Sequence, residues 1–155
     1  MKSDSPKKSP KTARRAAREI AVQALYAWHL NADKTAAELL EPLENQREFA
    51  HAHREFLDLI LGGVLAKKTE LQTALQPFLD RDFAALSPIE SSILLLGAFE
   101  LTQMPETPLP VILNEAIELA KSFGGTDSHK YINGVLDKLA QTARAIEYSA
   151  RKNPR

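Results

Sequence analysis

Three arginines near the amino terminus have the side-chain type and the spacing to bind an anionic partner. Arg14, Arg15 and Arg18 lie within about one and a half turns of any helix that contains them. An arginine guanidinium is planar and permanently charged, so it matches phosphate oxygens and also stacks on bases. The cluster therefore makes nucleic acid the first partner to consider. The alternative is that the cluster is simply a solvated, charged helix end.

No set of side chains has the spacing of a catalytic or metal site. The sequence contains no cysteine, which excludes disulfides, thiolate zinc ligands and a cysteine nucleophile. The four histidines show no metal spacing, since His51 and His53 would point to different sides of a helix. The Gly124-Gly125 pair lacks a Walker lysine pattern and a preceding strand, so it predicts a helix end. We expect no enzyme activity, no metal and no cofactor.

The charges are distributed unevenly along the chain, although the net charge at pH 7 is zero. Residues 1–18 contain seven basic residues and one acidic residue, a net charge of +6, which leaves −6 for the remainder. Residues 1–11 are Ser, Pro and Lys with almost nothing to bury, so we expect a disordered basic arm. A basic end on an acidic body is typical of a local nucleic-acid footprint, although a basic tail can also simply aid solubility.

Helical periodicity runs through most of the remaining sequence. Apolar residues recur at three- and four-residue spacing, and no stretch alternates with period two for long enough to form a strand. We therefore expect an all-α protein of about seven helices. Their ranges are about 13–29, 34–45, 47–68, 70–79, 88–104, 108–123 and 128–147.

Two of these helices have especially clear sequence patterns. The first is apolar from Ile20 to Trp28, so its rear half is anchored in a core while its front half presents the arginines. The second opens with Ser87-Pro88-Ile89-Glu90, in which Ser caps, Pro takes the first helical position and Glu90 completes a capping box. Because this second helix is apolar nearly all round, we expect it at the centre of the fold.

Finer expectations concern the long 47–68 helix and its neighbours. His53 falls in the apolar stripe of that helix, where we expect a satisfied core or boundary histidine. Gly62-Gly63 within the stripe predicts a close helix approach or a local bend. Asp33 is expected to cap the preceding helix, which Pro42 bends or ends. Glu115 and its charged neighbours predict a solvated helix face.

Several stretches resemble the NusB family of transcription antitermination factors. They are RRAAREIAVQALYAW, LSPIESSILLLGAFEL, VILNEAIELAK and NEAIELAKSFGGTDSHKYINGVLDKL, in that order. The resemblance covers about residues 12–145, and the glycine turn followed by SHKYINGVLDK is its most specific part. It implies two small helical bundles packed together, with residues 12–147 as a NusB-like RNA-binding domain. Residues 148–155 then remain as a flexible basic tail.

The resemblance also implies a function in transcription. Members of the family bind RNA as half of a heterodimer with NusE, a small-subunit ribosomal protein. The pair recognises the single-stranded boxA element of nascent ribosomal RNA transcripts, and the complex joins other Nus factors on RNA polymerase to suppress premature termination. A cytoplasmic protein without membrane association is expected, since no apolar run is long enough to cross a bilayer and the first residues are polar.

Carried over by position, the resemblance implies two sets of functional residues. The RNA-binding set is Arg14, Arg15, Arg18, Asp127 and Tyr131, and the set that faces NusE is Tyr26 and Glu90. Ala16 stands where family members often have another arginine, so the arginine motif is thinner here. Tyr131 stands where the family usually has Phe, and the alternative for this residue is a core aromatic. Glu90 has a structural alternative in the capping box.

Two other classes of function are weighed against this one. Ribosomal RNA cytosine methyltransferases carry a NusB-like domain, but they require a cofactor-binding domain and catalytic cysteines that this sequence lacks. A DNA-binding protein would insert the first helix into the major groove, but a clear helix-turn-helix is missing. The net charge of −6 on the remainder of the chain instead suits attraction of a basic ribosomal protein.

Overall fold

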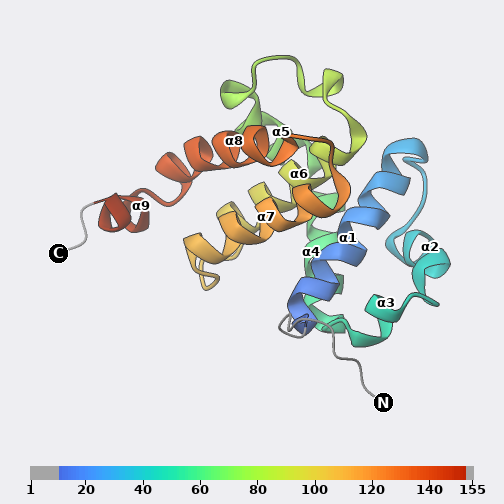
Figure 1. Cartoon of the computed structure of the whole chain (residues 1–155). Coiled ribbons are helices and arrows are strands. Elements are labelled where there is room, and N and C mark those ends of the chain that lie inside the picture. Colours follow the sequence, from blue (N-terminus) through green and yellow to red (C-terminus); the bar gives the residue numbers. More distant parts are fainter. Residues whose placement is uncertain (1–10, 153–155) are drawn as a thin grey trace.

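The computed structural model describes residues 11–152, and every regular element in that part is helical. The predicted all-α class is confirmed, with nine α-helices in the described part where about seven were expected (Figure 1). Most of the predicted arm, residues 1–10, lies outside the described residues. The elements are α1 Ala13–Leu30, α2 Ala36–Leu40, η1 Glu41–Leu43, α3 Arg47–His51, α4 Arg54–Ala66, α5 Lys68–Leu75, η2 Gln76–Phe78, η3 Phe83–Ala85, α6 Pro88–Gln103, α7 Leu109–Phe123, α8 Ser128–Ala143 and α9 Ala145–Lys152.

Helix α6 lies at the centre of the fold, as its sequence predicted. All its residues from Ser91 to Leu101 are buried, and it packs against α1, α4, α5, α7 and α8. Helices α2, α3 and α4 pack on α1 at one side of α6, while α7 and α8 pack on each other at its other side (Figure 1). One continuous hydrophobic core joins the two sides. Within residues 11–152, no helix is long and apolar enough to cross a membrane.

The predicted 47–68 helix is divided at Ala52 and His53, whose backbones are extended. His53 is the amino-terminal cap of α4, because its Nδ1 accepts a hydrogen bond from the Phe56 amide at 3.1 Å. Its own amide donates to the carbonyl of Ala13 at 3.0 Å, which ties the start of α4 to the start of α1. The placement of His53 inside a helix was therefore wrong, whereas the expected boundary histidine agrees with its half-buried side chain, which satisfies a helix end.

The start of α2 differs from expectation, and its end agrees with it. Thr35, and not Asp33, caps α2: its hydroxyl accepts from the Glu38 amide, and the Glu38 carboxylate accepts from the Thr35 amide. This is a complete capping box. Pro42 lies in the 3-10 turn that follows α2 directly, in agreement with the prediction that it bends or ends the helix.

The carboxyl-terminal segment is helical as far as Lys152, where a flexible tail was expected from residue 148. The Tyr148 hydroxyl donates to Asp137 of α8 at 2.9 Å. Arg144, between α8 and α9, donates to four backbone carbonyls of α6 and its following turn. These carbonyls belong to Glu100, Leu101, Met104 and Thr107. Glu147 binds Arg144 at 2.8 Å and also accepts from the Leu109 amide, at the first residue of α7.

The adjacent glycines of α4 provide a matched test of the packing between α4 and α6. A Cβ atom at Gly63 would collide with the buried ring of Phe99, whereas one at Gly62 would meet nothing within 4 Å. We expect Gly63→Ala to lower the free energy of unfolding by about 1–3 kcal/mol through overpacking. Gly62→Ala should raise it by up to about 1 kcal/mol, because alanine is the better helix former. Urea denaturation of both variants measures the difference, and equal effects would contradict this packing.

Candidate nucleic-acid interface

The start of α1 places the three arginines on its first two turns. Thr12 caps the helix, with its hydroxyl accepting from the Arg15 amide at 3.0 Å. The first turn contains no acidic residue, so the arginines lie at the positive end of the helix dipole. An anion bound there interacts favourably with both the helix end and the guanidinium groups. Ala16, Ala17 and Ile20 are fully buried, which fixes the orientation of the helix on the core.

Arg18 is buried and does not present its guanidinium to a partner. Its side chain is 4% exposed and forms two hydrogen bonds of 2.8 Å with the carboxylate of Glu100 in α6. A second carboxylate, from Glu115 of α7, lies 3.8 Å away. The structure therefore differs from the expectation of three presented arginines. The reason is that Arg18 lies on the face of α1 that packs against the core, where buried carboxylates neutralise it.

Arg15 is held but still accessible. It forms a two-pronged ion pair with Glu115, at 3.1 Å and 2.8 Å, while its side chain remains 39% exposed. Hydrogen bonding to Glu115 raises the pKa of Arg15, so its charge is permanent. The expectation that Glu115 belongs to a solvated face was wrong, because its carboxylate contacts two arginines of α1.

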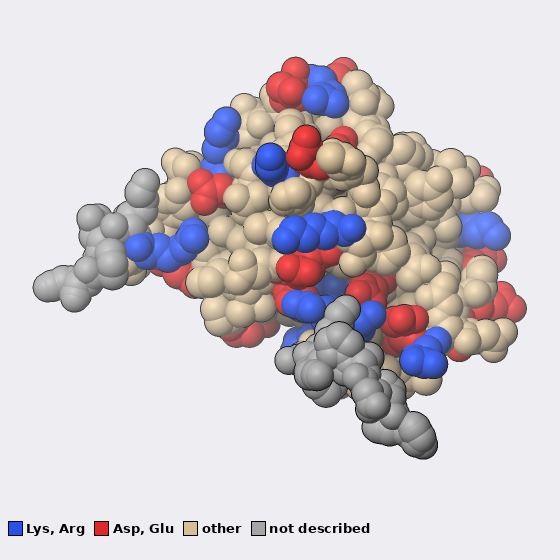
Figure 2. All heavy atoms as spheres, in the orientation of Figure 1, with Lys and Arg blue, Asp and Glu red and all other residues tan. Residues whose placement is uncertain are grey.

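Arg14 is the exposed member of the cluster. Its guanidinium carbon lies 4.5 Å from the ring centroid of Phe56, and within residues 11–152 it has no hydrogen bond or ion pair. This side chain lines a groove of about 590 Å³, together with Thr107 and Val111. Basic and acidic side chains alternate on the molecular face that Figure 2 shows, without one large patch of either sign. Among the described residues of the arginine cluster, Arg14 is therefore the one whose charge no carboxylate neutralises.

The second group of predicted RNA-binding residues surrounds the start of α8. Asp127 is exposed and has a left-handed backbone with φ of 71°, and its carboxylate lies 3.5 Å from the Lys130 ammonium. A Cβ atom at Gly124 would collide with Ala120 and Ser128, so this tight turn requires glycine there.

Glu90 reaches the same turn. The Ser87 hydroxyl accepts from the Glu90 amide, but the Glu90 carboxylate accepts from the Ser128 hydroxyl at 3.3 Å instead of completing the expected capping box. Glu90 therefore joins the start of α6 to the start of α8.

Tyr131 is half-buried, and both its hydroxyl and its ring contact other residues. Its hydroxyl donates to Asp80 at 3.0 Å, and the Arg81 guanidinium lies 5.1 Å from the ring centroid. Burial raises the pKa of the Tyr131 hydroxyl. Hydrogen bonds from Arg81 and Tyr131 lower the pKa of Asp80 to about 2. The ring also packs against the core, which agrees with the core alternative.

Tyr26, the other residue predicted to face a protein partner, is 40% exposed on α1. A pocket of about 460 Å³ is lined by Trp28 and His29 of α1 and by Ser91 and Ser92 of α6, while Tyr26 itself does not line it. Glu90 immediately precedes these serines. The two predicted partner residues thus lie on the two helices that border one pocket.

The predicted RNA-binding residues form two separate groups. Arg14, Arg15 and Arg18 cluster at the start of α1, and Asp127 and Tyr131 cluster at the start of α8 (Figure 1). Within the described residues, no hydrogen bond, ion pair or ring contact joins one group to the other. Glu115, which binds the arginines, precedes the end of α7 at Phe123 by about 12 Å of helix. A ligand that touches both groups must therefore be extended.

Several contact residues were not assigned to the site from the sequence. They are Phe56, Asp80, Arg81 and Glu100. Only Glu100 had a visible cue, since it is a charged residue inside an otherwise apolar helix. Groups of three or more His, Cys, Asp or Glu that could hold a metal ion do not occur in the part of the chain that the structure describes.

The fold and the interface define an all-α protein that presents an arginine-bearing helix start. Solved structures with this fold include NusB from T. maritima, with a TM-score of 0.72, 25% identity, and coverage of 90% of this chain and 99% of that one. Another is the crystal structure of antitermination factors NusB and NusE in complex with dsRNA, with a TM-score of 0.72 and 21% identity over 82% of this chain and 95% of that one. The latter likeness concerns the fold alone.

Sequence comparison gives the family. A profile of the NusB family matches residues 15–141. The chain is 49% identical over 145 residues to the transcription antitermination protein NusB of Chromobacterium violaceum, covering 94% of this chain and 97% of that protein. It is 46% identical over 147 residues to the protein of the same name from Ralstonia nicotianae, covering 95% and 94%. The chain belongs to the NusB family.

The buried ion pair predicts different roles for Arg18 and Arg14 in stability. Arg18→Met should lower the free energy of unfolding by about 3–5 kcal/mol, because Glu100 is left as a buried charge without its partner. Arg14→Met, at an exposed position, should change it by less than about 0.5 kcal/mol. Chemical denaturation of both variants provides the test. If Arg18→Met unfolded like the parent, the ion pair would have no structural role.

The Asp80 contacts predict a pH effect at the start of α8. Because ionised Asp80 accepts these hydrogen bonds, their contribution to stability is complete above its ordinary pKa of 3.8 and is lost as the pH falls through about 2. In Tyr131→Phe one donor is removed, so the pKa of Asp80 should rise toward 3.8. Carboxyl-carbon NMR titration measures this shift. Tyr26→Phe is the control and should leave the Asp80 titration unchanged.

Proposed function

We propose that this protein is a transcription antitermination factor that binds RNA together with NusE. Membership of the NusB family and the names of its relatives support this function. A neighbour in fold is a complex of NusB and NusE with dsRNA, which supports RNA and NusE as the partners. The single observation that carries the proposal is the start of α1, where Arg14 is exposed and unneutralised at the positive end of a helix.

In this proposal the RNA is the single-stranded boxA element of nascent ribosomal RNA transcripts. Arg14 and Arg15 bind phosphates, and Arg18 holds α1 in place from the interior. Asp127 and the edge of Tyr131 provide the second contact, at the start of α8. Two contact groups separated along α7 suit an extended single strand, whose unstacked bases are accessible to side chains.

NusE is proposed to bind the surface between Tyr26 and Glu90. The pocket of about 460 Å³ between the two helices offers room for a side chain of the partner. The chain outside residues 1–18 carries a net charge of −6, which favours association with a basic ribosomal protein. The complex would then join other Nus factors and RNA polymerase in the cytoplasm. This role is one of binding and assembly, without a catalytic step.

Fluorescence titration of a boxA RNA and a scrambled RNA, with and without NusE, tests the proposal. We expect boxA to bind more tightly than the scrambled sequence and NusE to increase that affinity. Each phosphate contact should contribute about −0.7 to the slope of log K against log salt on a single strand. Equal binding of both RNAs under either condition would contradict a boxA-reading function.

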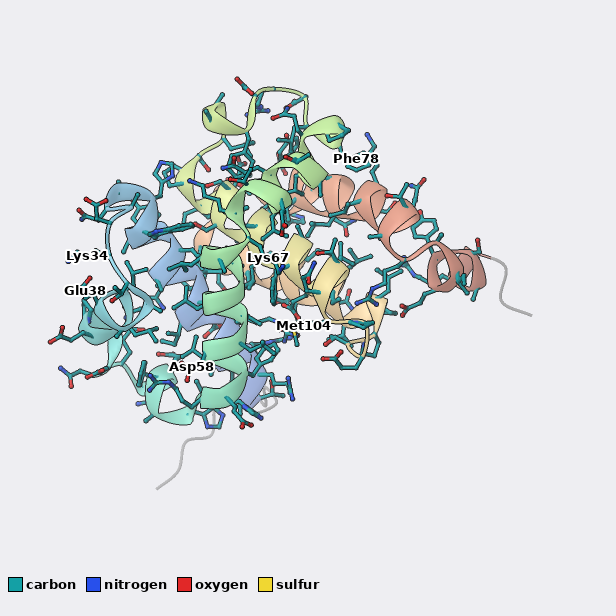
Figure 3. The ribbon with its side chains drawn as sticks, turned by 180° about the vertical axis from the view of Figure 1, so that it is seen from behind. Lys34, Glu38, Asp58, Lys67, Phe78 and Met104 are labelled. Carbon is teal, nitrogen blue, oxygen red and sulfur yellow. The ribbon has the colours of Figure 1, made fainter. Side chains whose placement is uncertain are left out.

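Charge-matched variants identify the interface in the same titration. Arg14→Gln should weaken RNA binding and make the salt slope less negative by about 0.7. Lys67→Gln removes the same charge at the far end of α4 (Figure 3), and we expect it to bind RNA like the parent. If the two variants weakened binding equally, the effect would be one of net charge, and the assignment of Arg14 would be wrong.

A further inference from the structure

Phe56 of α4 contacts two of the three arginines of α1. The guanidinium carbon of Arg14 lies 4.5 Å from the ring centroid, and that of Arg18 lies 5.0 Å from it. The ring is 3% exposed, so it is fixed by its surroundings. A cation within about 6 Å of an aromatic ring face is attracted to it, and arginine is the cation most often found there.

The position of this ring relative to α1 is well defined. The His53 amide donates to the Ala13 carbonyl, and the His53 ring accepts from the Phe56 amide. The two rings also meet edge to face, with centroids 6.3 Å apart. One turn of α4 is therefore attached to the first residue of α1, and the ring is held beside the arginines.

Arg14 differs from its two neighbours in what restrains it. Carboxylates hold Arg15 and Arg18, whereas the contact with Phe56 is the restraint that the described residues provide for Arg14. A carboxylate occupies the donors of a guanidinium, but an aromatic ring lies against its face and leaves its five N–H groups free. An arginine held in this way is ordered and still able to bind.

The space around Arg14 suits this arrangement. The groove of about 590 Å³ lies on one side of the residue, and a second one of about 500 Å³, which includes Phe56 and Leu59, also borders it. Arg14, His53 and Glu106 line both of these hollows. The N–H groups of Arg14 therefore have room for a phosphate or a base edge.

We propose that Phe56 is a positioning residue for RNA binding, which orders Arg14 through its ring face without neutralising it. This proposal rests on the proposed function, because it assigns to Phe56 a role in the same interface. Ordering a rotamer-rich side chain before binding reduces the entropy lost when the complex forms. The residue is buried on another helix, so it acts through Arg14 and not by touching RNA.

A double-mutant cycle on RNA affinity tests the proposal with four proteins: the parent, Phe56→Leu, Arg14→Gln and the double variant. Leucine keeps an apolar side chain but removes the aromatic face. We expect Phe56→Leu to weaken binding of boxA RNA about two- to fivefold when Arg14 is present. In the Arg14→Gln background the same substitution should have no further effect. Phe56→Tyr keeps the ring face and should bind within about twofold of the parent.

A readout without RNA separates ordering from simple packing. In the free parent, the side-chain protons of Arg14 should show upfield ring-current shifts in NMR spectra. Phe56→Leu should remove these shifts and Phe56→Tyr should retain them. Thermal melting of each variant shows whether it is folded at the temperature of the titration.

The outcomes distinguish this proposal from the one on which it rests. If Arg14→Gln weakens binding but Phe56→Leu does not, Phe56 has no positioning role and the RNA function stands. If Phe56→Leu weakens binding equally in both backgrounds, it acts through stability and the positioning role is again overturned. If Arg14→Gln leaves RNA affinity unchanged, the assignment of Arg14 fails and the role of Phe56 fails with it.

Discussion

The buried ion pair between Arg18 and Glu100 is the interaction on which the arrangement of the interface depends. Two charges removed from water are stable only when their geometry satisfies both, and these groups form two hydrogen bonds of 2.8 Å. The pair joins the first helix of the fold to its central helix, across 82 residues of sequence. Any shift of α1 along α6 would separate the two charges, so the pair fixes where the remaining arginines stand.

Three arginines within five residues thus have three different environments. A buried carboxylate of α6 neutralises Arg18, and a carboxylate of α7 restrains Arg15. An aromatic ring of α4 orders Arg14. Residue type alone does not distinguish them. Burial and the neighbours supplied by α4, α6 and α7 decide which side chain is free to meet an anion.

The sequence was sufficient for features that depend on local pattern. The apolar run and the Ser-Pro start predicted the central position of α6, and the apolar rear half of α1 predicted its anchoring. The sequence was insufficient to predict which side chain forms a hydrogen bond with the free backbone groups at a helix end. Nothing in the periodicity of residues 47–68 separates a helical His53 from a capping one, because both keep the ring beside apolar neighbours. The same limit applies to Glu115, whose partner Arg15 is 100 residues away.

The cluster of carbonyls around Arg144 has a consequence for the order in which the chain folds during synthesis. The end of α6 and the turn after it leave the carbonyls of Leu101 and Thr107 as acceptors for Arg144, a donor that is synthesised about forty residues later. While the ribosome is still adding α7 and α8, those acceptors remain paired with water. The central helix therefore reaches its final, dry environment only after residue 144 has left the exit tunnel, so its completion is a late event in biogenesis.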